Sequence, residues 1–81
     1  ETVSLQLPDH MIGIIFDRFG KEIDLRRLSN GNVGVRVKAA VSGQFYGWLT
    51  GLGKDVLLLG PEHVKDGYVA FIKNIMNQYE Q

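Results

Sequence analysis

The sequence predicts an α+β fold, and three observations lead to that prediction. The length of 81 residues fits one domain. The composition, with 44% hydrophobic and 22% charged residues, is ordinary for a globular protein. Segments with the alternating period of a strand are interleaved with segments of helical period, in the order strand, helix, strand, strand, helix, strand, helix. With right-handed crossovers, this order predicts a ferredoxin-like βαββαβ sandwich with an additional C-terminal helix and one open sheet face.

The first strand and the first helix are predicted over residues 2–20. Apolar and polar residues alternate over residues 2–7, which is the pattern of a half-buried strand. Pro8 and Asp9 then suit the first turn of a helix, and Gly20 suits the position just after its end. Between these signals, apolar residues recur at helical spacing: Met11, Ile12, Ile15, Phe16 and Phe19.

A β-hairpin is predicted next. Residues 22–28 and 33–39 both alternate, and Asn30-Gly31 lies between the two runs. Asn-Gly between alternating segments is the strongest short-range hairpin signal, because both residues accept positive φ. The second and third strands are therefore predicted to pair around this dipeptide.

The second half of the chain predicts a helix, a short strand and a long helix. Ser42 is a suitable N-cap and Gly53 a suitable stop for the second helix. Residues 56–59 form a continuous apolar run typical of a short strand, and Pro61 with Glu62 suits the start of the last helix. That helix has an amphipathic stripe over about four turns: Val64, Tyr68, Phe71, Ile72, Ile75, Met76 and Tyr79. It covers a sheet edge, extends the helical layer or pairs with another subunit, and the sequence leaves these three alternatives open.

Composition excludes several classes of function. The formal net charge of zero and the pI near 7.0 argue against nucleic-acid binding by this domain alone, which needs a surplus of lysine and arginine. The absence of cysteine excludes disulfides, thiolate metal sites and cysteine nucleophiles, and it fits a reducing cytoplasm. No apolar run approaches the roughly 18 residues of a membrane span. We therefore expect a cytoplasmic domain, and its start at Glu1 indicates a piece excised from a longer protein.

No catalytic, metal or cofactor site is predicted. His10 and His63 each lie in the first turn of a predicted helix and have no second ligand at i+3 or i+4. Gly51 and Gly53 form a G-x-G that follows a helix and precedes a strand, the reverse of the dinucleotide-binding arrangement. An acylphosphatase-type enzyme needs an arginine in a glycine-rich loop after the first strand, and that loop has neither residue here. We expect a domain that is not an enzyme.

Aromatic residues also fail to indicate RNA binding. The two predicted central strands, residues 3–7 and 33–39, contain no aromatic residue on which a base would stack. Phe45, Trp48 and Phe71 instead lie on the apolar stripes of predicted helices. We expect these three rings to pack in the core.

One group of charges stands out. The outward positions of the second and third strands place Arg26, Arg36 and Lys38 on the open sheet face, with Asp24 nearby. If the hairpin pairs around Asn30-Gly31, Arg26 lies across from or diagonal to Arg36, and like charges directly opposite destabilise a sheet. Two interpretations remain open: recognition of an anion by the arginines, or protection of an edge strand by charge with a local bridge to Asp24.

Three motifs, in order, resemble the WCX domain, the C-terminal extension that follows the WYL domain in bacterial transcription regulators. They are the strand 3–7 before a helix ending at 18–20, the hairpin 28–35, and the run WLTGLGKDVLLLGP over 48–61, which resembles the family pattern W-L-x-G-x-G-x-x-V-x-V-x-x-P. The sequence departs from the family at Gly47, where a larger residue is usual, and at Leu57 and Leu59, where polar residues are more common. The two leucines predict that this edge is covered in the intact protein.

The resemblance implies a single WCX-like domain over 1–81, at the C-terminal end of a regulator with an N-terminal winged helix-turn-helix and a central WYL domain. Its implied partners are that WYL domain, a second copy in a homodimer, and an effector. From the strand pattern we expect Arg26, Arg36 and Lys38 to bind an anionic or nucleic-acid effector, and we expect operator DNA to be contacted only through the N-terminal domain of the parent. Two alternatives are a domain that serves assembly alone and a small-molecule-binding domain of the amino-acid-sensing type.

Overall fold

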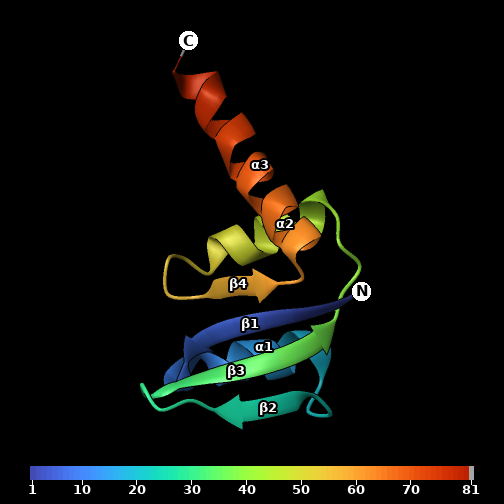
Figure 1. Ribbon diagram of the computed structural model, residues 1–81, viewed down its shortest axis with the longest axis vertical. Helices are drawn as coiled ribbons and strands as arrows, with labels where there is room; N and C mark the ends of the chain where they lie inside the picture. The colour runs from blue at the N-terminus through green and yellow to red at the C-terminus, as the bar shows by residue number, and fades with distance from the viewer. Residues whose placement is uncertain (81) are drawn as a thin grey trace.

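Four strands form one antiparallel sheet in the order β2-β3-β1-β4 (Figure 1). The computed structural model describes residues 1–80. Its elements, with a short 3-10 turn over Asp9–Met11 before the first helix, are β1 Thr2–Pro8, α1 Ile12–Phe19, β2 Asp24–Arg27, β3 Asn32–Lys38, α2 Gly43–Gly51, β4 Leu57–Gly60 and α3 Glu62–Tyr79. The strand order and the helix positions confirm the predicted ferredoxin-like arrangement with a C-terminal helix.

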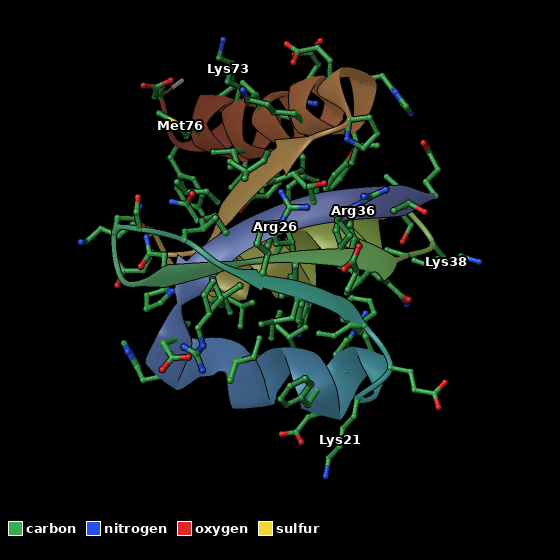
Figure 2. All side chains as sticks on the ribbon, turned by 60° about the horizontal axis from the view of Figure 1, so that its bottom comes forward. Lys21, Arg26, Arg36, Lys38, Lys73 and Met76 are labelled. Atoms are coloured by element: carbon green, nitrogen blue, oxygen red, sulfur yellow. The ribbon has the colours of Figure 1, made fainter. Side chains whose placement is uncertain are left out.

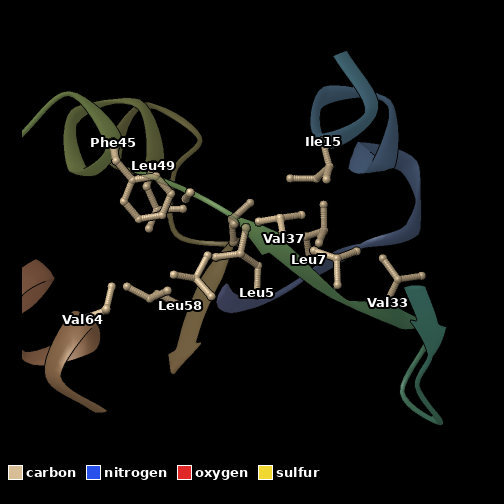
Figure 3. Close-up of a cluster of buried hydrophobic side chains, with 13 residues drawn as sticks. Leu5, Leu7, Ile15, Val33, Val37, Phe45, Leu49, Leu58 and Val64 are labelled. Atoms are coloured by element: carbon tan, nitrogen blue, oxygen red, sulfur yellow. The ribbon is translucent and has the colours of Figure 1, made fainter. Parts of the chain in front are cut away.

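The core lies between the sheet and the helices α1 and α2, which lie behind the sheet in Figure 1. Alternation decides which side chains enter it, because successive strand residues point to opposite faces. Figure 3 shows the buried side chains converging from the central strands, both helices and the start of α3. The fully buried large side chains are Val3, Leu5, Leu7, Ile15, Val33, Val35, Leu49 and Val64.

The hairpin between β2 and β3 forms as predicted, but with a different turn. The Leu28 N–H donates to the Asn32 carbonyl at 2.9 Å, so the loop has three residues, Ser29 to Gly31. Gly31 has a φ of 83°, whereas no residue other than glycine has positive φ among residues 1–80. The expectation that both residues of Asn30-Gly31 use positive φ is therefore wrong. A three-residue loop needs only its last residue in that region.

Trp48 joins the two helices that cover the sheet. Its ring meets Phe19 of α1 edge-to-face at 5.5 Å between centroids, and the Arg18 guanidinium lies 4.9 Å from its ring centre. Phe45, one turn earlier in α2, is buried in the core. The Ser42 hydroxyl caps this helix by accepting the Phe45 N–H at 3.4 Å, as predicted. The expectation that Phe45 and Trp48 pack in the core is confirmed. For Phe71 it is wrong, because this half-buried ring lies against Tyr46 and is not part of the core.

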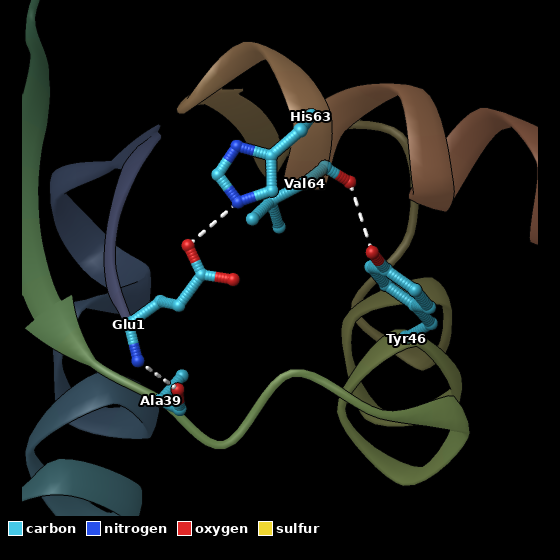
Figure 4. A network of polar contacts seen from close by, with 5 residues as sticks. All are labelled: Glu1, Ala39, Tyr46, His63 and Val64. Atoms are coloured by element: carbon cyan, nitrogen blue, oxygen red, sulfur yellow. Dashed lines mark hydrogen bonds and ion pairs between the residues drawn. The ribbon is translucent and has the colours of Figure 1, made fainter.

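The first turns of α3 are anchored, and the remainder leaves the body of the domain (Figure 1). The Tyr46 hydroxyl donates to the Val64 carbonyl at 3.0 Å, and His63 Nε2 lies 2.7 Å from a Glu1 carboxylate oxygen (Figure 4). Val64 is the buried residue of the helix. Farther along, Met76 is 50% exposed and Tyr79 is 86% exposed. The start of α3 thus extends the helical layer beside α2, while its C-terminal half has an uncovered apolar stripe.

The environment of Tyr46 makes the attachment of α3 sensitive to alkaline pH. Burial, and secondly the negative charge of Glu1, raises the pKa of the Tyr46 hydroxyl above its ordinary value of 10.0. The folded state therefore holds this proton at a pH where the unfolded state has lost it. The resulting stability is fully present below the unfolded pKa of about 10 and is lost as pH rises through the folded pKa. We expect the free energy of unfolding, measured by urea titration at pH 9 to 11, to fall less steeply with pH in Tyr46→Phe. Equal slopes would contradict this assignment.

Candidate functional site

The candidate site is the face of the sheet opposite α1 and α2. In Figure 2, Arg26 and Arg36 rise from the sheet on the side away from α1. Strand alternation and register send the following side chains to this face: Ser4, Gln6, Asp24, Arg26, Arg36, Lys38, Leu57 and Leu59. The alternate residues of β1, β3 and β4 are buried in the core, whereas β2, at the sheet edge, is exposed along its whole length. The face is therefore basic along β2 and β3 and apolar along β4.

The register of the hairpin sets how the arginines meet. Arg26 lies opposite Gly34, and Asp24 lies opposite Arg36. The two arginines are therefore diagonal neighbours, one of the two arrangements that the sequence predicts, and they avoid direct like-charge opposition. Arg36 Nη1 lies 3.8 Å from an Asp24 carboxylate oxygen, and both side chains are mostly exposed. Such a long, exposed pair contributes little to stability, so Arg36 remains available to another anion.

Of the three site cations, Arg26 and Lys38 have no acidic partner in the described part of the chain. Lys38 lies opposite Thr2 at the end of β3 and points outward from the sheet (Figure 2). The predicted bridge between the hairpin arms therefore exists, but it neutralises only one of the three predicted cations.

The three predicted cations line two separate hollows in this region. One, of about 210 Å³, lies over Gly34 and is lined by Ser4, Leu5, Asp24, Arg26, Leu28, Val35, Arg36 and Leu59. The other, of about 490 Å³, is lined by Thr2, Phe19, Glu22, Ile23, Asp24, Arg36, Val37 and Lys38. Arg36 and Asp24 line both hollows, whereas Arg26 lines only the first and Lys38 only the second. The structure thus places Arg26 and Arg36 at one hollow and Lys38 beyond it.

Sequence reasoning did not identify Gly34 and the leucines around it as part of a site. A Cβ built on Gly34 would meet Leu28 Cδ2 at 3.8 Å, an ordinary contact, and the φ of Gly34 is not positive. The backbone therefore does not require glycine here, although glycine weakens a strand. A glycine inside an alternating strand often marks close approach of a ligand or another backbone, and this signal was present in the sequence.

Neither histidine lines the two hollows. His63 contacts Glu1 at the start of α3, and His10 lies in the 3-10 turn after β1. Within residues 1–80, no group of three His, Asp or Glu side chains has the arrangement of a metal site. No helix in that part of the chain is long and apolar enough to cross a membrane.

Comparison with known proteins identifies the family. The family model of the WCX domain matches residues 2–76, which is nearly the whole chain. No curated protein and no solved structure matches it. The match includes every strand, α1, α2 and most of α3, and it therefore includes the hairpin and the basic face described above. The chain belongs to the WCX domain family.

Proposed function

We propose that this domain is the C-terminal regulatory module of a bacterial transcription regulator with helix-turn-helix and WYL domains. In that role it contributes to effector sensing and to dimerisation, and it has no catalytic activity of its own. Membership of the WCX family supports the regulatory role. The net charge of zero supports a division of labour in which another domain reads the operator.

The observation that supports the sensing role is that Arg26 and Arg36 are diagonal neighbours on an open sheet face and, within residues 1–80, share a single acidic partner, Asp24. Guanidinium groups donate several hydrogen bonds in a planar fork that suits carboxylate and phosphate. We propose that they bind the anionic group of the effector, with Lys38 adding longer-range attraction from the next hollow.

Replacing both arginines tests the sensing role. Arg26→Ala with Arg36→Ala should weaken binding of inorganic phosphate by about ten-fold or more, because charge-assisted hydrogen bonds are lost. Binding is measured by NMR titration of the labelled 81-residue chain. The double variant Lys21→Ala and Lys73→Ala, which removes the same charge away from the face (Figure 2), should bind as the unchanged chain does. Equal losses in the two double variants would show nonspecific attraction and remove the proposal.

The uncovered stripe of α3 supports the dimerisation role. Ile75 and Met76 are 45% and 50% exposed, and Tyr79 beyond them is more exposed still. Contiguous exposed apolar residues on a helix commonly mark a protein–protein contact. Burying this stripe against another subunit would remove apolar surface from water.

Charges placed on this stripe test the role. Ile75→Lys with Met76→Lys should shift the chain from dimer to monomer in light scattering, since lysine is depleted from the buried centres of interfaces. Asn74→Lys with Asn77→Lys adds the same charge at exposed positions of the same helix and should leave the molar mass unchanged. A strict monomer at high concentration for the unchanged chain would refute a dimer formed through α3.

A small-molecule-binding domain of the amino-acid-sensing type is the second candidate. The hollow over Gly34 favours it, because a bare sheet face would suffice for charge attraction alone.

A further inference from the structure

We propose that the hollow over Gly34 binds a small organic monoanion. Its acid group lies between the guanidinium groups of Arg26 and Arg36, and its single ring or branched chain lies over Gly34. This inference rests on the proposed function, because the same arginines hold the acid group. It adds the chemical class of the rest of the ligand.

Charge selects a ligand with one negative charge. The lining of the hollow contains Arg26 and Arg36 with two positive charges and Asp24 with one negative charge, which leaves one positive charge. Asp24 already lies 3.8 Å from Arg36, whereas Arg26 has no acidic partner within residues 1–80. A monoanion would neutralise the hollow and give Arg26 the partner it lacks.

The walls select an apolar group attached to that acid. Leu28, just after β2, and Leu59, in β4, line the hollow with Gly34 between them, while Leu59 remains 48% exposed. An inorganic anion would leave both leucines in water, whereas a hydrocarbon group would cover them. The volume of about 210 Å³ lies below the roughly 300–1,000 Å³ of drug-sized sites. It therefore suits one ring or one branched chain.

Gly34 is an independent indication of a ligand. Its backbone conformation is open to any residue, and the nearest atom to an added Cβ is 3.8 Å away. A branched side chain would fit the strand better and would fill the hollow. Glycine at this position keeps the floor of the hollow low, which is the arrangement a closely approaching ligand requires.

A matched set of probes tests the ligand class. In NMR titrations of the labelled chain, 3-phenylpropionate should shift the amides of Arg26, Gly34 and Arg36. Its uncharged amide, 3-phenylpropionamide, should bind about ten-fold more weakly because it lacks the negative charge. Equal binding of acid and amide, or shifts confined to other parts of the chain, would overturn the inference.

Filling the hollow separates this inference from the proposed function. Gly34→Val should weaken the binding of 3-phenylpropionate by about ten-fold. Inorganic phosphate needs only the arginines, so its affinity for this variant should stay within about two-fold of its affinity for the unchanged chain. A second variant, Leu59→Ser, removes an apolar wall at an exposed position and should likewise weaken the binding of 3-phenylpropionate. If both variants keep full affinity for 3-phenylpropionate while phosphate still requires Arg26 and Arg36, the hollow is not a ligand site and the arginine proposal stands. If the arginine double variant binds both 3-phenylpropionate and phosphate as tightly as the unchanged chain does, both proposals are overturned.

Substitution of Asp24 is expected to strengthen ligand binding, whereas the preceding variants are expected to weaken it. For a monoanion, Asp24→Asn removes a competing carboxylate and should tighten 3-phenylpropionate binding by a few-fold. Phenylalanine, which adds an ammonium group to the same skeleton, should bind more weakly than 3-phenylpropionate. Tighter binding of phenylalanine that is lost in Asp24→Asn would assign Asp24 to a ligand ammonium and overturn the monoanion in favour of a zwitterion.

Discussion

Replacing Leu5 by alanine is expected to destabilise the domain by about 2–5 kcal/mol, the range for leucine-to-alanine changes in cores. Leu5 lies in central strand β1, opposite Val35 of β3 and Leu58 of β4, and it is fully buried. A domain of 81 residues has a total stability of roughly 4–12 kcal/mol at about 0.05–0.15 kcal/mol per residue. The substitution is therefore expected to leave much of the chain unfolded at 37 °C, as measured by circular dichroism during urea titration.

Leu57 provides the matched control. It lies on the open face and is 47% exposed, so Leu57→Ala should change the free energy of unfolding by about 0.5 kcal/mol or less. Comparable losses at Leu5 and Leu57 would mean that the open face is covered in solution. They would then contradict the assignment of the core to one face of the sheet.

Gly67→Ala is expected to destabilise the attachment of α3, although alanine favours helix by about 1 kcal/mol over glycine. A Cβ built on Gly67 would collide with the Tyr46 hydroxyl and lie 3.3 Å from the ring carbon that bears it. The ring cannot move freely, because it packs against Tyr68 at 5.7 Å and Phe71 at 5.6 Å between centroids. We expect a net loss of about 1–3 kcal/mol, the usual cost of overpacking, and faster hydrogen exchange of α3 amides.

Two further variants isolate the cause. Gly13→Ala in α1 has open space around its Cβ and should stabilise the domain by up to about 1 kcal/mol. In a Tyr46→Phe background, which removes the colliding oxygen, Gly67→Ala should cost clearly less than in the unchanged chain. A stabilising Gly67→Ala would show that the Tyr46 ring does not lie against α3.

The central part of the fold was predictable because it depends on local chemistry. The alternation in β1 and β3 identified the buried valines and leucines, and Ser42 and Gly20 marked helix ends that the structure confirms. The last strand was predicted less accurately. The run 56–59 is apolar throughout, but the strand is Leu57–Gly60, and Leu57 and Leu59 face outward. An apolar run gives no period, so the sequence alone could not separate its buried residues from its exposed ones.

The candidate site was predictable in part for the same reason. Strand period placed Arg26, Arg36 and Asp24 on one face, and the structure confirms that placement. Lys38 shares the face but lines another hollow, because it lies at the end of β3. Gly34 and Leu59 come from β3 and β4, which are separated by β1 in the sheet, so no spacing in the sequence relates them.

The sequence by itself determined the class of fold, the family resemblance and the sign of charge on the open face, since periodicity and residue type are properties of short segments. Only the tertiary structure decided that the arginines are diagonal, that a hollow forms over Gly34 between two leucines, and that α3 is anchored at Tyr46 and then exposed. Register and packing decide these features, because they bring together residues distant in the chain, and a pattern along the chain has no information about which of them meet.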